Sequence, residues 1–160
     1  MNEHADQYII LSKGTWLQGE FEICDADGKM LWIGKSERFA VMWPTLTVAD
    51  PSGMALLTAE RKRMFPFARF VLMEDNNPVC VIRQPNVFRQ QFVMEFTNGV
   101  ICTFDMPKLR GTFSGESITG LKVEVAVDRY NWNITVHGEM SRLHLLSALT
   151  VLYREWMKSD

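Results

Sequence analysis

The sequence predicts a mainly antiparallel β fold, either a barrel or a sandwich, ended by a single strongly apolar helix. Short apolar runs are separated by Gly, Pro, Asn and Asp residues along most of the chain, a pattern typical of strands joined by turns. No helical segment between these runs is long enough to connect parallel strands, which excludes a doubly wound α/β fold. From about Ser141 to about Lys158 the pattern changes to that of a helix.

Length and composition are those of one ordinary folded domain spanning residues 1–160. A chain of 160 residues buries roughly two thirds of the surface that its unfolded form exposes, so its core sustains the fold unaided. Hydrophobic residues make up 47% and charged residues 22%, which excludes a disordered or fibrous protein. The net charge of −2 provides no overall field that attracts nucleic acid, and we do not expect nucleic acid as a partner.

The cysteine pattern does not indicate a disulfide-stabilised secreted protein. Cys24, Cys80 and Cys102 each stand inside a strand-like run, without C-x-x-C spacing. The first residues carry no recognisable secretory signal. We therefore expect reduced thiols in the core or on a strand face, and a cytoplasmic protein.

Strand-like runs follow a polar start at residues 1–7, which we expect to be flexible. The runs are 8–13, 19–24, 30–35, 39–43, 45–49, 54–63, 67–73, 79–83, 92–97, 100–105, 112–116, 121–128 and 132–137. Turn-forming residues separate them, and Asn98-Gly99 is the sharpest hairpin signal. Run 121–128 alternates apolar with mostly polar residues, which predicts one buried face and one wet face. The residues that share the apolar face of this run are Leu121, Val123, Val125 and Val127, with the small Ala126 on the opposite face.

The predicted helix at about residues 141–158 is too apolar for an ordinary surface position. Ser141 suits the N-cap, and Lys158 suits the C-terminal end of the helix dipole. Large apolar side chains cover about half of the circumference, interrupted by a narrow polar stripe of His144, Ser147 and Thr150. The apolar stretch 143–157 spans about 22 Å, short of the roughly 30 Å hydrocarbon core of a membrane. We therefore expect no transmembrane helix.

Four consecutive segments carry a resemblance to a known family. They are residues 21–28, 31–35, 46–53 and 55–64, with the sequences FEICDADG, LWIGK, LTVADPSG and ALLTAERKRM. Their order resembles the LURP-one-related family of the tubby-like superfamily, which also contains the tubby C-terminal domain and the phospholipid scramblases. The resemblance covers nearly the whole chain and implies a closed antiparallel barrel of roughly twelve strands around a central hydrophobic helix. The proline-rich arm, cysteine cluster and acidic calcium segment of scramblases are absent from the sequence.

The resemblance also implies binding of phosphoinositides or other anionic lipids, because tubby domains bind them through basic side chains on the barrel. The basic residues available for this role are Lys35, Arg61, Lys62, Arg63 and Arg69. Residues 54–90 carry six basic side chains against three acidic ones, and arginine binds phosphate through paired hydrogen bonds. The alternative interpretation of residues 61–63 is a solvated strand end whose charges prevent edge pairing.

Other chemistry has little support in the sequence. The segment Asp25-x-Asp27-Gly28 lacks the further acidic ligands of a calcium loop, and we interpret it as a hairpin turn. The three histidines are too scattered for a zinc site, and no nucleophile or P-loop motif occurs. We expect no metal, no cofactor and no catalytic residue. For the polar stripe we expect hydrogen bonds to inward-facing strand groups, with a polar ligand site inside the fold as the alternative.

These observations favour a non-enzymatic binding or adaptor domain. We expect it to recognise an anionic lipid headgroup or a protein partner through an external basic face, peripherally at a membrane. The alternatives are a lipocalin-like barrel that carries a small apolar ligand with the helix packed outside, and an enzyme without a recognised motif. Aromatic candidates for membrane contact are Trp16, Trp43 and residues 65–67, although most aromatic residues should be core.

Overall fold

The structure is a computed structural model that describes residues 5–13, 19–36, 45–63, 69–85, 91–105 and 111–158. These residues form twelve strands and one helix. The strands are β1 (Ala5–Lys13), β2 (Glu20–Asp25), β3 (Met30–Ser36), β4 (Thr45–Ala49), β5 (Ala55–Arg63), β6 (Arg69–Glu74), β7 (Asn77–Arg83), β8 (Gln91–Phe96), β9 (Ile101–Asp105), β10 (Gly111–Glu116), β11 (Lys122–Asp128) and β12 (Asn131–His137). Helix α1 spans Arg142–Lys158. The predicted strand at 39–43 and the aromatic residues at 16, 43 and 65–67 lie outside the described residues.

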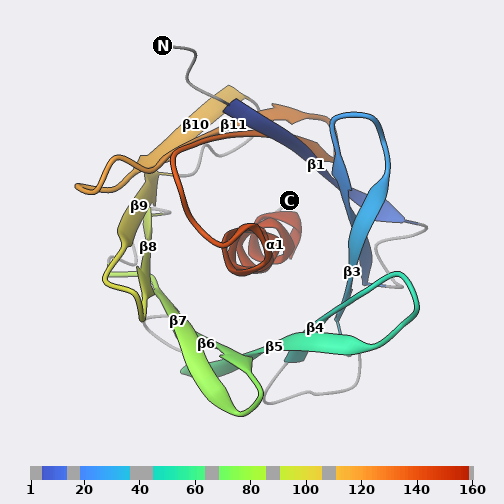
Figure 1. Ribbon diagram of the computed structural model, residues 1–160, viewed down its shortest axis with the longest axis horizontal. Coiled ribbons are helices and arrows are strands. Elements are labelled where there is room, and N and C mark those ends of the chain that lie inside the picture. Colours follow the sequence, from blue (N-terminus) through green and yellow to red (C-terminus); the bar gives the residue numbers. More distant parts are fainter. Residues whose placement is uncertain are drawn as a thin grey trace.

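The strands form a closed antiparallel barrel in which each strand pairs with its neighbours in the chain (Figure 1). Pairing of β1 with β12, for example Ile10 with Trp132, closes the sheet. Closure satisfies the backbone groups that an edge strand would leave unpaired. The predicted antiparallel β fold is confirmed, as a barrel rather than a sandwich. The sequence pattern places residues 5–7 in a flexible start, whereas they extend β1, because they continue its pairing with β12.

Alternation of apolar and polar residues turns one face of each strand toward the barrel interior. In β11, Val123 and Val125 are buried, whereas Lys122 and Glu124 are exposed. Val127, near the end of the strand, is only half-buried. The predicted buried and wet faces of this segment are therefore confirmed.

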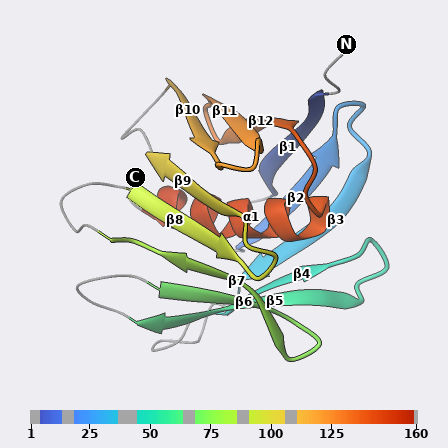
Figure 2. The same cartoon turned by 60° about the vertical axis from the view of Figure 1, so that its left-hand side comes forward.

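Helix α1 occupies the centre of the barrel (Figures 1 and 2). Every residue from Leu145 to Tyr153 has an exposed fraction of 0%, because strands surround the helix on all sides. Ser141 caps the helix, since its Oγ accepts a hydrogen bond from the backbone N–H of His144 at 3.3 Å. The expected central helix is confirmed. Among the residues that the structure describes, no helix has the length and apolar character needed to cross a membrane.

A column of aromatic rings joins α1 to the barrel wall. Tyr153 of α1 packs edge to face against Phe21 of β2 and Trp132 of β12, with ring centroids 5.2 and 5.3 Å apart. Trp132 contacts Phe113 at 5.1 Å, and Phe113 contacts Phe104 at 6.3 Å. Such pairs contribute about 0.5–1.5 kcal/mol each beyond their burial. The column therefore fixes the helix against one side of the wall.

The hairpin turns after β2 and β4 lie at the end of the barrel where α1 begins. The Asp25 carboxylate accepts hydrogen bonds from the backbone N–H groups of Asp27 and Lys29, and Asp50 makes the equivalent bonds in its own turn. Gly28 closes the first of these turns with a φ of 84°, which favours glycine. The predicted hairpin turn at Asp25-x-Asp27-Gly28 is therefore confirmed.

At the opposite end of the barrel, α1 ends close to three strands. Arg154 of the helix lies beside Ser36, the last residue of β3, and beside Phe70 near the start of β6. Arg61, near the end of β5, packs on the same Phe70 ring. We call this end, marked by Ser36, Arg61, Phe70 and Arg154, the exit end of the barrel.

Candidate functional site

The five basic residues that the sequence singles out do not form one cluster. They lie on β3 (Lys35), β5 (Arg61, Lys62 and Arg63) and β6 (Arg69). Lys35 is level with Thr58 of β5, through the pairs Lys35–Thr47 and Thr47–Thr58. Standard strand dimensions therefore place Lys35 and Lys62 about 10 Å apart across the sheet and about 13 Å apart along it. Lys35 instead faces Glu20 of β2, with 3.9 Å between its Nζ and the carboxylate.

A β-bulge separates the three basic residues of β5. Arg61 pairs with Phe70, and Arg63 pairs with Arg69, so Lys62 is the extra residue on this strand. Arg61 lies on the inner face of the wall, because its guanidinium carbon is 5.8 Å from the centroid of the fully buried Phe70 ring. Lys62 is on the outer face, where its Nζ donates to Glu60 Oε2 at 2.6 Å. Arg61 and Lys62 therefore lie on opposite faces of the wall.

An arginine pair that the sequence analysis did not single out lies on the outer face of the exit end. Arg69 of β6 is directly opposite Arg83 of β7, and both side chains are exposed. Arg83 forms an ion pair with Glu95 of β8, with 2.5 Å between Nη2 and Oε1. Arg69 has no hydrogen bond or ion pair with any residue that the structure describes. Arg63 continues this row by backbone register, and its side chain lies outside the described residues.

A second basic group lies inside the exit end. Arg154 of α1 is 3% exposed, and its guanidinium carbon is 5.9 Å from the centroid of the Phe70 ring. Burial lowers the pKa of Arg154; the carboxylate of Glu155 opposes this shift, and Arg61 adds to it. Arginines therefore lie on both sides of the wall formed by β5 and β6. Arg61 of β5 and Arg154 of α1 are on the inner side, and Arg69 of β6 is on the outer side.

The polar stripe of α1 differs in part from its expected hydrogen bonding. His144 meets an inward strand group as predicted, because its Nε2 lies 3.3 Å from Glu74 Oε2 of β6. Thr150 donates to the carbonyl of Leu146 in its own helix at 2.8 Å, and not to a strand. The buried Ser147 hydroxyl has no hydrogen-bond partner among the described residues. The expectation of strand partners is therefore wrong for Thr150 and Ser147.

Metal and thiol chemistry find little support in the described part of the chain. Within it, no group of three His, Cys, Asp or Glu side chains is placed to hold a metal ion. Cys24, Cys80 and Cys102 are buried and unbridged. Burial raises the pKa of Cys102 to about 11, so its thiolate is scarce near neutral pH.

Comparison of the chain with models of protein families, with curated proteins and with solved structures gave no match. The resemblance to the tubby-like superfamily therefore stays a prediction. It predicts a closed barrel around a central helix, and the chain has that architecture.

Proposed function

We propose that the protein is a non-enzymatic, tubby-like binding domain that recognises a phosphorylated lipid headgroup, such as a phosphoinositide, at a membrane surface. The headgroup binds on the outer face of the exit end, at Arg69 and Arg83, with Arg63 and Lys62 beside them. Lys35 is too far along the wall to contact the same headgroup, and Arg61 faces inward.

The observation that carries this proposal is the placement of Arg69 directly opposite Arg83. Like charges at directly opposed strand positions destabilise a sheet by roughly 0.2–1 kcal/mol. Glu95 offsets the charge of Arg83, whereas no described residue offsets that of Arg69. A bound phosphate group would remove this repulsion and occupy the unused donors of Arg69.

The geometry of adjacent strands also suits phosphate. Neighbouring strands lie about 4.8 Å apart, so two opposed guanidinium groups can approach oxygens of one phosphate group. Charged side chains at the rim of a barrel reach a flat membrane surface more easily than those midway along the wall. Attraction to anionic lipids contributes about 1 kcal/mol for each basic side chain near the surface.

The lipocalin-like alternative has no comparable observation in its favour. A carrier of small apolar ligands needs an open lumen and a helix outside the barrel. In this chain, Leu145, Leu149 and Leu152 of α1 lie fully buried within the lumen. A ligand is therefore better accommodated on the outer face than in the centre.

Cosedimentation with vesicles tests the proposal. Wild-type protein should bind phosphatidylcholine vesicles that contain phosphatidylinositol bisphosphate at low salt, and release them as salt is raised. The double variant R69Q/R83Q should bind roughly 30-fold more weakly, since two contributions of about 1 kcal/mol are lost. The matched control K35Q/K122Q removes the same charge elsewhere on the barrel and should bind like wild type.

Two results would count against the lipid-binding function. One is the absence of wild-type binding at low salt. The other is equal binding by R69Q/R83Q and by the wild type. An equal loss in K35Q/K122Q would indicate attraction by overall charge and not a site at Arg69 and Arg83.

A further inference from the structure

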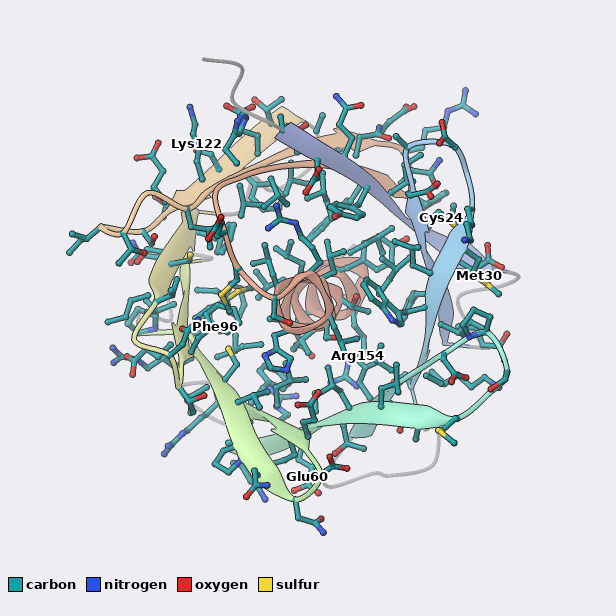
Figure 3. All side chains as sticks on the ribbon, in the orientation of Figure 1. Cys24, Met30, Glu60, Phe96, Lys122 and Arg154 are labelled. Carbon is teal, nitrogen blue, oxygen red and sulfur yellow. The ribbon has the colours of Figure 1, made fainter. Side chains whose placement is uncertain are left out.

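Arg154 is buried inside the exit end, and two of its three nitrogen atoms make no hydrogen bond to any described residue. Its side chain lies between α1 and the wall of the barrel (Figure 3). Nη1 donates to Ser36 Oγ at 3.3 Å, whereas Nε and Nη2 make no hydrogen bond to any described residue. Nη2 is 3.8 Å from Glu155 Oε1, too far for a hydrogen bond. A buried charged group normally has its donors satisfied, so these two donors require an explanation.

The two unused donors form one edge of the guanidinium group. Nε and Nη2 point in nearly the same direction, which is the edge that grips two oxygens of a carboxylate or phosphate side by side. The edge is therefore arranged for an oxyanion and not for a single carbonyl. Nη1, on the other side, holds the group in place through Ser36.

Arg61 places a second positive charge near the Phe70 ring, which Arg154 also contacts. Its guanidinium carbon is 5.8 Å from the centroid of the Phe70 ring, and that of Arg154 is 5.9 Å from it. Both guanidinium groups therefore lie within cation–π range of the same ring. Arg61 is half-buried and therefore partly accessible to solvent, whereas Arg154 is 3% exposed. Glu155 is the acidic neighbour of Arg154. The charges of Arg61, Arg154 and Glu155 together sum to about one positive unit at neutral pH.

The helix dipole acts against an anion here. The C-terminal end of α1 carries partial negative charge, which weakly disfavours a nearby anion. A hydrogen bond between charged groups stabilises more strongly than the end of a helix dipole opposes, and the open edge of Arg154 offers two such bonds. The arginines therefore outweigh the dipole.

We propose that an oxyanion of the phosphate type binds inside the exit end of the barrel, between Arg154 and Arg61. Two of its oxygens accept hydrogen bonds from Nε and Nη2 of Arg154, and Arg61 covers the side toward solvent. This inner site is separated by the barrel wall from the outer arginines, Arg69 and Arg83, and does not depend on lipid binding there. The phosphate is carried by a soluble phosphorylated compound or by a lipid headgroup that reaches into the barrel mouth.

Calorimetric titration of the full chain with inorganic phosphate and with a soluble inositol trisphosphate tests the inner site. Saturable binding is expected for the wild type, measured against sodium chloride at equal ionic strength. R154Q and R61Q should each weaken this binding at least tenfold, whereas K122Q, which removes an exposed basic side chain of β11 away from both proposed sites, should leave it unchanged. Thermal unfolding followed by circular dichroism checks that each variant is folded.

The half-exposed Arg61 keeps the test decisive where R154Q does not fold, because R61Q removes little buried structure. The inner site is overturned when wild type shows no saturable binding of either probe, or when R61Q binds both as well as wild type does. It is also overturned when K122Q weakens soluble-phosphate binding as much as R61Q does.

Vesicle binding by R61Q distinguishes the two sources of the phosphate. A loss on vesicles as well as in calorimetry assigns the inner site to a lipid headgroup, and a loss in calorimetry alone assigns it to a soluble compound. Both results support the inner site. Failure of lipid binding at Arg69 and Arg83 would appear separately, as unaltered vesicle binding by R69Q/R83Q.

Discussion

Gly115 of β10 lies directly opposite Phe104 of β9, and the Phe104 ring fills the space that a side chain at position 115 would take. A Cβ built at Gly115 would stand 2.5 Å from Cζ of that ring, closer than real Cβ atoms approach a neighbour. Phe104 is fully buried, and its ring packs on Phe113. Phe104 is therefore the last ring of the aromatic column that begins at Tyr153 of α1. The Phe104 ring can occupy its place at the end of the aromatic column only because Gly115 has no side chain.

Replacement of Gly115 by alanine should destabilise the protein by about 1–3 kcal/mol, because the new methyl group displaces a tightly packed ring. The free energy of unfolding in urea, measured for wild type and Gly115→Ala, checks this value. Ser114→Ala, on the exposed outer face of the same strand, should change it by less than about 0.5 kcal/mol.

A double-mutant cycle separates packing from strand propensity in the Gly115 variant. Phe104→Leu alone should destabilise the core, but it should cost less when Gly115 is already alanine, since the smaller side chain makes room. Additive effects of the two substitutions would contradict a direct clash between these residues.

Ser147 of α1 should be a site where a smaller, less polar residue stabilises the protein. Its hydroxyl is fully buried and has no partner among the described residues. An unsatisfied buried hydroxyl costs about 1–3 kcal/mol, and alanine is also the better helix former. Ser147→Ala should therefore raise the free energy of unfolding by about 1 kcal/mol in urea denaturation. A lower stability would mean that the hydroxyl has a partner in solution, such as an ordered water molecule.

The strands could be predicted from local sequence because each carries its own alternation, whereas closure into a barrel was implied only by the family resemblance. In β11 the apolar positions are the buried ones, and the turn at Asp25 is stabilised by its own carboxylate. The helix could be placed in the centre because an almost wholly apolar segment is stable only where it is surrounded. These features depend on residues close to one another in the chain.

The outer arginine pair could not be predicted in the same way, because it depends on a bulge. The turn after Glu74 pairs that residue with Asn77, and continuing this register would place Arg69 opposite Ile82. A register shift between Leu72 and Met73 moves the pairing by one residue, so Arg69 meets Arg83 instead. A single bulged residue thus brings two arginines together, and local alternation does not locate it.

The inner site had a partial signal in the sequence. The polar stripe His144, Ser147 and Thr150 continues along the helix to Arg154, four residues after Thr150. That spacing places Arg154 on the same side of α1. Its contacts with Ser36 and Phe70 join residues that are more than eighty positions apart in the chain, and such a meeting follows only from the closed barrel.

The three cysteines should resist modification as long as the protein is folded. All three are buried, and burial raises the pKa of Cys80 and, to about 11, that of Cys102. At pH 8 a pKa of about 11 leaves roughly one Cys102 side chain in 1,000 as the reactive thiolate. Ellman's reagent should therefore not label any cysteine rapidly in the native protein. In denaturant it should label all three cysteines. A thiol that reacts at once in the native state would contradict this burial.

Asp50 should lose part of its stabilising effect only at low pH. Hydrogen bonds from the Ser52 hydroxyl, and then from the Met54 backbone N–H, lower the pKa of Asp50 below its ordinary value of 3.8. A carboxyl group with a lowered pKa in the folded state stabilises the turn fully above 3.8 and loses this effect as the pH falls through the lowered value. Carbon-detected NMR titration of the Asp50 carboxyl group measures it directly. Ser52→Ala should raise the pKa of Asp50 toward 3.8, because the largest cause of its lowering is removed, whereas Ser117→Ala in another turn should leave it in place. An unchanged Asp50 titration in Ser52→Ala would assign the lowered pKa to the backbone N–H groups of the turn alone.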